Sequence, residues 1–160
     1  MAFKLDALPY RPFSNYFGMS ERDLKDASAR TLTVPAKPGY PCVVSLADAD
    51  AELGERVLLA NFTHLPQNTP YRASHAIYVR EGAVQASLGA GEVPEMLASR
   101  LLAIRGYDDA HMMVFADVID GARLAAELDG TFADAAVRCI HIHVAKPGCF
   151  AARATRPEDS

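Results

Sequence analysis

Short runs of apolar and β-branched residues, each ended by proline, glycine or acidic turn residues, constrain the fold of this chain more than any other feature. Runs of this kind, alternating with polar residues or apolar throughout, are typical of β-strands. Most of the connections between them are shorter than the helical crossover that parallel strands require. The sequence therefore predicts an α+β fold built on a mainly antiparallel sheet with a few short helices.

The pattern predicts these strands and helices in order along the chain. Strands are predicted over residues 30–34, 42–46, 57–62, 75–79, 101–104, 112–119, 137–144 and 150–154. Helices are predicted over residues 21–27, 94–100 and 122–128. Ser20 is expected to cap the first helix, and Gly130 to end the third in a left-handed conformation. The strands over 42–46 and 57–62 are expected to pair as a central hairpin.

The length and composition of the chain indicate one ordinary globular domain. It has 160 residues, of which 50% are hydrophobic and 22% are charged. This length is enough to bury a single core, and the balance differs from that of a disordered protein. The whole chain, residues 1–160, is expected to form a single domain in which residues 156–160 are a short tail.

Charge and hydropathy exclude some partners. The net charge of −4 argues against nucleic acid, whose binding proteins usually carry a basic face. The first residues lack the uninterrupted apolar stretch of a secretory signal, and no later window approaches about 18 apolar residues, so no membrane partner and a cytoplasmic location are expected. The three cysteines cannot all pair within one chain and are expected to be free thiols. A small-molecule ligand and a homo-oligomeric state are both left open.

The clearest candidate site is the face of the strand over 137–144 that carries two histidines. Alternation places Cys139, His141 and His143 on one face of this strand, with Ile140 and Ile142 on the other. The isoleucine face is predicted to be the core face. The histidine face then meets either solvent or a cleft.

Imidazole and thiolate groups on one strand face suit zinc or another borderline transition metal. The metal ligands predicted here are His141, His143 and Cys139. The spacing lacks the paired Cys-x-x-Cys motif of a strong zinc prediction, and half-buried polar side chains on a wet sheet face explain the same pattern. A site would need further ligands or a base, and the candidates are His64, His75, Asp117 and Asp120.

Cys149 is a conditional candidate for this site. If residues 147–148 form a two-residue turn, Cys149 points away from the histidine face, and Phe150, Ala152 and Ala154 lie on it. A bulge would reverse this assignment. The chain has no Gly-x-Ser-x-Gly motif, and Cys42 and Cys149 are interpreted either as inert thiols or as nucleophiles activated by a histidine.

Four segments together resemble a known family. They read PGYPCVVSL from residue 38, GERVLL from residue 54, PYRASHAIYVR from residue 70, and HIHVA from residue 141 followed by Gly148 and Cys149. In this order they resemble domain of unknown function 1203 (DUF1203), an uncharacterised bacterial family, over about residues 3–156. The resemblance implies a bacterial origin and one compact domain, and it brings no activity with it. The family pattern has an arginine where this chain has Val43.

Two functional hypotheses follow. In the first, the protein is a small-molecule binding or interaction module whose polar Cys/His site contacts a ligand or a second subunit. In the second, it is a small hydrolase or lyase that is metal-dependent or works by acid-base catalysis. In that case His141, His143 and His75 would be catalytic. The ligand-binding residues predicted alongside them are Arg72, Tyr71 and His64.

Overall fold

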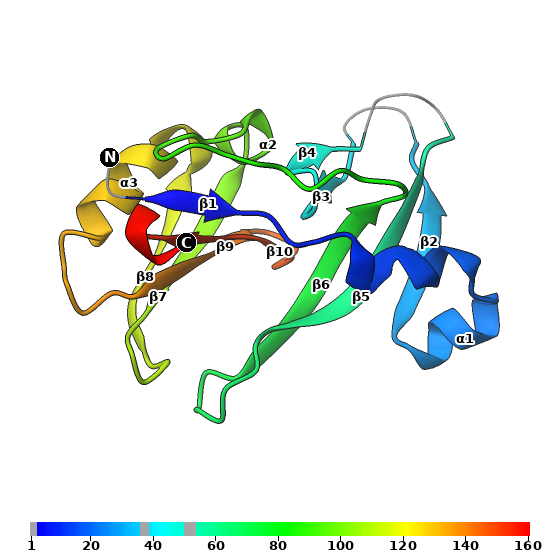
Figure 1. Cartoon of the computed structure of the whole chain (residues 1–160), viewed down its shortest axis with the longest axis horizontal. Coiled ribbons are helices and arrows are strands. Elements are labelled where there is room, and N and C mark those ends of the chain that lie inside the picture. The colour runs from blue at the N-terminus through cyan, green and yellow to red at the C-terminus, as the bar shows by residue number, and fades with distance from the viewer. Residues whose placement is uncertain (1–2, 36–38, 50–53) are drawn as a thin grey trace.

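Two five-stranded sheets dominate the computed structural model, which describes residues 3–35, 39–49 and 54–160. Sheet A has the strand order β1 (Lys4–Asp6), β10 (Phe150–Thr155), β9 (Cys139–Val144), β7 (Leu101–Tyr107) and β8 (Met113–Asp120). Sheet B has the order β2 (Ala29–Thr33), β5 (Arg56–Leu65), β6 (Ala73–Arg80), β3 (Pro41–Cys42) and β4 (Ala47–Asp48). All described strand pairs are antiparallel except β3 with β6. The predicted α+β class is confirmed (Figure 1).

The helices are short. They are η1 (Arg11–Gly18), α1 (Glu21–Asp26), α2 (Glu95–Ala98), η2 (Gly121–Arg123), α3 (Leu124–Thr131) and η3 (Pro157–Asp159), where η marks a 3-10 helix. The predicted cap of α1 is confirmed, because the Ser20 hydroxyl accepts a hydrogen bond from the Asp23 amide at 3.1 Å. Within the described ranges, no helix is long and apolar enough to span a bilayer.

The end of α3 differs from the prediction. Gly130 lies inside the last turn, and the helix continues to Thr131 with Phe132 as its C-terminal cap. Phe132 is buried in the main core, and the Thr131 hydroxyl donates to the Glu127 carbonyl at 2.7 Å. Burial of Phe132 therefore extends the helix past the glycine that was expected to end it.

The predicted hairpin between residues 42–46 and 57–62 is wrong. Instead β5 pairs with β2 and β6, while β3 pairs with β4 and β6. Residues 43–46 form turns in which Val43 and Val44 are fully buried, and Leu46 has a left-handed φ of 47°. Apolar residues here indicate burial beneath the sheet, and periodicity alone does not separate that from a strand.

Two apolar cores lie on either side of sheet A. One packs Ile140 and Ile142 of β9 against α2, α3 and β1, so the isoleucine face is a core face as predicted. The other packs the inner face of sheet B, including Ile77, against η1 and α1, and it also takes in Phe150 of sheet A. The side of β9 that faces away from the isoleucines is therefore turned toward sheet B.

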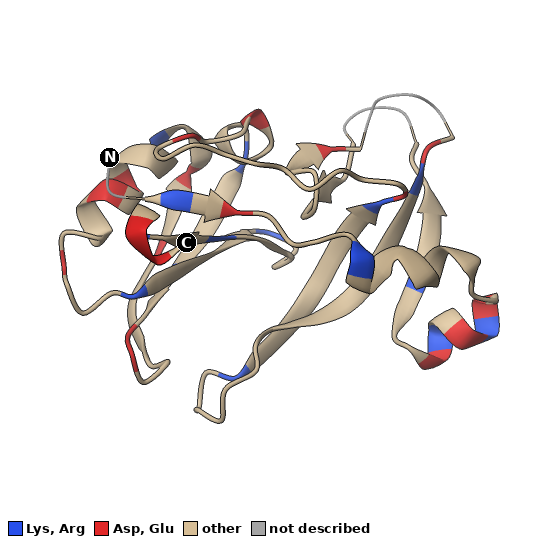
Figure 2. Ribbon diagram, viewed as in Figure 1, with Lys and Arg blue, Asp and Glu red and all other residues tan. Residues whose placement is uncertain are grey.

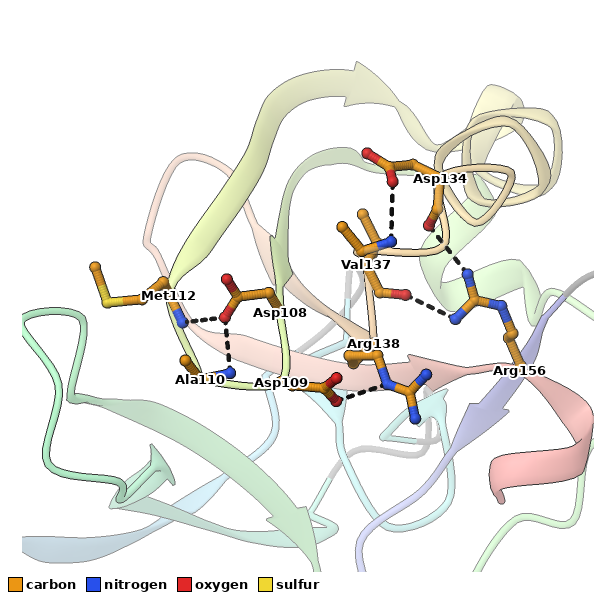
Figure 3. Close-up of polar contacts among 9 residues, drawn as sticks. Asp108, Asp109, Ala110, Met112, Asp134, Val137, Arg138 and Arg156 are labelled. Carbon is orange, nitrogen blue, oxygen red and sulfur yellow. Dashed lines mark hydrogen bonds and ion pairs between the residues drawn. The ribbon is translucent and has the colours of Figure 1, made fainter.

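Arg156 holds the loop that leads into β9. Its guanidinium donates to the carbonyls of Val137 at 2.7 Å, Phe132 at 2.8 Å and Asp134 at 3.0 Å, and it lies 5.1 Å from the centre of the Phe132 ring. Figure 3 shows the contacts of Arg156 with Val137 and Asp134, together with the Arg138–Asp109 ion pair that ties the same loop to the β7–β8 turn. The start of β9 is thus fixed by contacts from the end of the chain.

Arg156→Gln is expected to lower the free energy of unfolding by about 2 kcal/mol, because hydrogen bonds to a charged donor contribute roughly 1.5–3 kcal/mol and glutamine replaces only one of them. Urea denaturation of the variant and the parent measures the difference. Arg30→Gln on β2 is the matched control, since Arg30 is an exposed strand arginine away from this loop. Equal stability of Arg156→Gln and the parent would show that the three Arg156 hydrogen bonds do not stabilise the fold.

Candidate functional site: a histidine cluster between the two sheets

Four of the five histidines of the sequence meet between the two sheets. His64 and His75 come from β5 and β6 of sheet B, and His141 and His143 come from β9 of sheet A. Alternation explains three of these directions. His75 shares a strand face with the buried Ile77, and the β9 histidines point away from the isoleucine core.

A β-bulge directs His64 into the cluster. Thr63 pairs with Ser74 and Leu65 pairs with Ala73, which leaves His64 as the extra residue of β5. Leu65 is then also buried, against Tyr107 and Cys139 of sheet A. A bulge allows two consecutive side chains to face the same region, which regular alternation forbids.

The rings form a chain of nitrogen contacts. His64 Nδ1 lies 2.8 Å from His141 Nδ1, and His64 Nε2 lies 2.6 Å from His75 Nδ1. The ring centres of His64 and His143 are 4.8 Å apart, and those of His75 and His143 are 4.6 Å apart. Phe150 stacks on His64 with ring centres 5.1 Å apart and closes the cluster on its apolar side.

The tautomer of His143 is fixed by the backbone. Its Nδ1 lies 3.0 Å from the Gly148 carbonyl oxygen, which only accepts, so Nδ1 carries the proton and donates. Its Nε2 therefore has a free lone pair. That atom is buried and has no hydrogen-bond partner among the described residues. Buried polar atoms are normally paired, so an unpaired lone pair beside two other imidazoles calls for a ligand.

All four histidines are held in the neutral form. Burial lowers the pKa of His64 to about 4, with the His75 and Arg105 charges lowering it further. Burial likewise lowers the pKa of His141 and of His143 to about 3. The pKa of His75 is also lowered, first by burial and then by Arg105. Neutral imidazole is the form that binds transition metals.

Three of the rings are placed to share an ion. One ring nitrogen from each of His64, His75 and His143 lies within 4.8 Å of the others. Nitrogens that bind one tetrahedral zinc at 2.0–2.1 Å are about 3.4 Å apart, so the widest pair would close by up to about 1.4 Å. The His64 and His75 nitrogens that lie 2.6 Å apart would instead have to separate. His75 is half-buried and gives the group its opening to solvent.

Only one of the three predicted metal ligands belongs to the group of three histidines. His143 belongs to the group of three, together with His64 and His75, which the sequence named as helpers. His141 touches the group through His64 and is almost fully buried, at 3% exposure. Cys139 lies beside Leu65 and Tyr107 instead, and burial raises its thiol pKa, which disfavours the thiolate that metals need.

The other predicted residues lie outside the group of three. Arg72 and Tyr71 are exposed in the connection between β5 and β6. Asp120 caps η2 by accepting from the Ala122 amide, and Asp117 accepts from the amide of Val118. The acidic candidates therefore satisfy backbone donors.

The cysteines outside β9 are buried and free, and burial raises the pKa of Cys42 to about 12. It also raises the pKa of Cys149. The two-residue turn on which the placement of Ala152 and Ala154 depended does not form, because β9 ends at Val144 and β10 begins at Phe150. A bulge between Phe150 and Ala152 pairs Ala152 and Ala154 with the isoleucines of β9 and buries them in that core. Of these three residues only Phe150 lies on the histidine side, where it pairs with His143. The bulge that follows Phe150 turns the next residues of β10 to the other face.

Sequence reasoning missed Arg105 and Arg153. Both are cross-strand partners of His141, from β7 and β10 respectively. No local motif surrounds either residue, and their placement depends on the register of strands far apart in the chain. That register could be found only from the structure.

Comparison with known proteins identifies the family. A family model described as "Protein of unknown function (DUF1203)" matches residues 39–156, which is more than half of the chain and includes all four clustered histidines. No curated protein and no solved structure matches the chain. The resemblance noted from the four sequence segments is confirmed, and the chain belongs to the DUF1203 family of proteins of unknown function.

Proposed function

We propose that this protein binds one zinc-like transition metal ion through His64, His75 and His143. The observation that carries the proposal is the buried, unpaired Nε2 of His143, facing two more neutral imidazoles. Magnesium and calcium prefer oxygen ligands, whereas imidazole suits zinc and its neighbours.

The remaining polar contacts fit supporting roles. His143 donates its other ring proton to the Gly148 carbonyl, the usual second contact of a metal-binding histidine. A metal on Nε2 of His64 would replace the contact between this nitrogen and His75 Nδ1, and the Nδ1 proton of His64 would remain available to donate to His141. His141 is then a positioning residue that orients His64.

Three protein ligands are the number found in catalytic zinc sites, where a fourth position is left for water or substrate. A metal in such a site acts as a Lewis acid and lowers the pKa of a bound water toward 7. This supports a small hydrolase or lyase over a module without chemistry. The chain contributes a dry apolar wall through Phe150, and solvent access beside His75.

Metal analysis of protein purified without a histidine tag tests the proposal. We expect close to one equivalent of zinc or a neighbouring metal, or one equivalent taken up when zinc is added to chelator-treated protein. Less than a tenth of an equivalent, unchanged by added zinc, would overturn it. A ligand that stabilises the metal-loaded protein without being turned over would favour the binding module over the enzyme.

A further inference from the structure

A row of charged side chains crosses sheet A beside the histidine cluster. Arg105 on β7 and Arg153 on β10 are the Cα partners of His141 on either side of β9. Directly paired residues of antiparallel strands project from the same face of a sheet. Both arginines therefore project from the histidine face.

The strands that carry the four histidines and the two arginines have no carboxylates, whereas β8 at the edge of sheet A has Asp117 and Asp120. The sequence has no Asp or Glu between Arg56 and Arg80, or between Arg138 and Arg156, although the chain has 20 acidic residues in all. In Figure 2 the acidic positions gather instead around α3, α1, the loops and the C-terminal end. Positive charge at the cluster thus has no acidic counter-charge on its own strands.

The same positive charge acts on all four histidines. Burial is the main cause of the lowered pKa of His64, His75, His141 and His143, and the charge of Arg105 lowers each of them further. A field that disfavours a proton on these rings also disfavours a metal cation among them. A bound anion would offset this field, so metal and anion are expected to bind more tightly together than separately.

An exposed apolar wall adjoins the arginine row. Ala103, Arg105, Ala116 and Val118 share the histidine face of β7 and β8, since Arg105 pairs with Ala116 and Ala103 pairs with Val118. With Ile104 and Asp117 they line an open depression of about 430 Å³, and Val118 is 57% exposed there. Asp117 pairs with Ile104, so its side chain projects from the opposite face of the sheet, and its carboxylate accepts from the Val118 amide. This surface is suited to the uncharged part of a small molecule.

We infer that the ligand of this site is a small organic oxyanion, a carboxylate or a phosphoryl compound, with an apolar body. Its anionic group binds Arg105, Arg153 and the metal, and its body lies over Ala103, Ala116 and Val118. The inference rests on the proposed metal site. Arginine is the side chain best shaped to bind such groups, through two parallel hydrogen bonds.

The experiment measures the dissociation constant of Co²⁺, a spectroscopic substitute for zinc, by visible absorption of chelator-treated protein. Titrations are run alone, with benzoate, with phenylphosphonate, and with uncharged benzamide. At least one oxyanion is expected to lower the dissociation constant about tenfold, within the 5- to 150-fold range of typical couplings. Complex formation between the oxyanion and free Co²⁺ would act in the opposite direction. Benzamide is expected to have no effect.

Two arginine variants and a control assign the effect. Arg105→Gln is expected to bind Co²⁺ more tightly than the parent without anion, and to reduce the oxyanion effect to twofold or less. Arg153→Gln should behave likewise, and provides the test if the first variant does not fold. Arg30→Gln, an exposed strand arginine of sheet B, should match the parent.

The two proposals fail differently. Co²⁺ binding that neither oxyanion changes by more than twofold would overturn the anion site and leave the metal site standing. An oxyanion effect that persists in both arginine variants would also overturn it. No Co²⁺ binding under any condition would remove the metal site and the anion site with it. The more effective oxyanion identifies the class of ligand.

Discussion

Metal-free protein is expected to lose most of its stability as the pH falls from 6.5 to about 4. The cause is the neutral state of the buried histidines, whose folded pKa lies near 4 for His64 and near 3 for His141 and His143. In the unfolded chain the same rings bind protons near pH 6.5. Below that value the unfolded state binds more protons, so stability is full above pH 6.5 and falls as the pH approaches the folded pKa values.

The expected slope is large. Each proton taken up on unfolding changes the free energy by about 1.4 kcal/mol per pH unit, so three histidines give about 4 kcal/mol per pH unit near pH 5. A typical domain has only about 5–15 kcal/mol in total. Urea denaturation at pH 7.5, 6.0, 5.5 and 5.0 measures the slope above the range in which ordinary carboxylates titrate.

A matched variant tests which histidines cause the slope. His111→Asn changes the one histidine outside the cluster and keeps a residue that tolerates its left-handed φ of 59°. This variant should show the slope of the parent. Stability that stays constant between pH 7.5 and pH 5.0 would show that the cluster does not exclude protons.

His143→Asn is expected to weaken Zn²⁺ binding by at least about a hundredfold. Changes in residues that only support metal ligands already cost 10- to 100-fold in affinity, and His143 is a proposed direct ligand. The asparagine amide can take the place of Nδ1 and donate to the Gly148 carbonyl, while nothing replaces Nε2. The variant thus removes the free lone pair and keeps the backbone contact.

Calorimetric titration of chelator-treated protein with Zn²⁺ measures this loss. His111→Asn serves again as the control and should bind zinc like the parent. His141→Asn should lose less than His143→Asn, because His141 contacts the metal group only through His64. Equal zinc affinity in His143→Asn and the parent would remove His143 as a ligand and, with it, the proposed set of three.

The sequence by itself determined the strand-rich α+β class, the family, and the two faces of β9. Alternation is a local property of the backbone, so the separation of His141 and His143 from the isoleucines followed from their spacing alone. The same rule explains the direction of His75 on β6, which was not predicted from the sequence. Local turn chemistry likewise placed the start of α1 at Ser20.

Only the tertiary structure decided which residues meet. The bulge at His64, the pairing of β5 with β6, and the register that sets Arg105 and Arg153 beside His141 all join residues distant in sequence. The same applies to residues 43–46, whose apolar character is satisfied by burial in a turn. Such outcomes depend on packing between segments that local propensity does not encode, and the group of three histidines, which takes members from both sheets, is one of them.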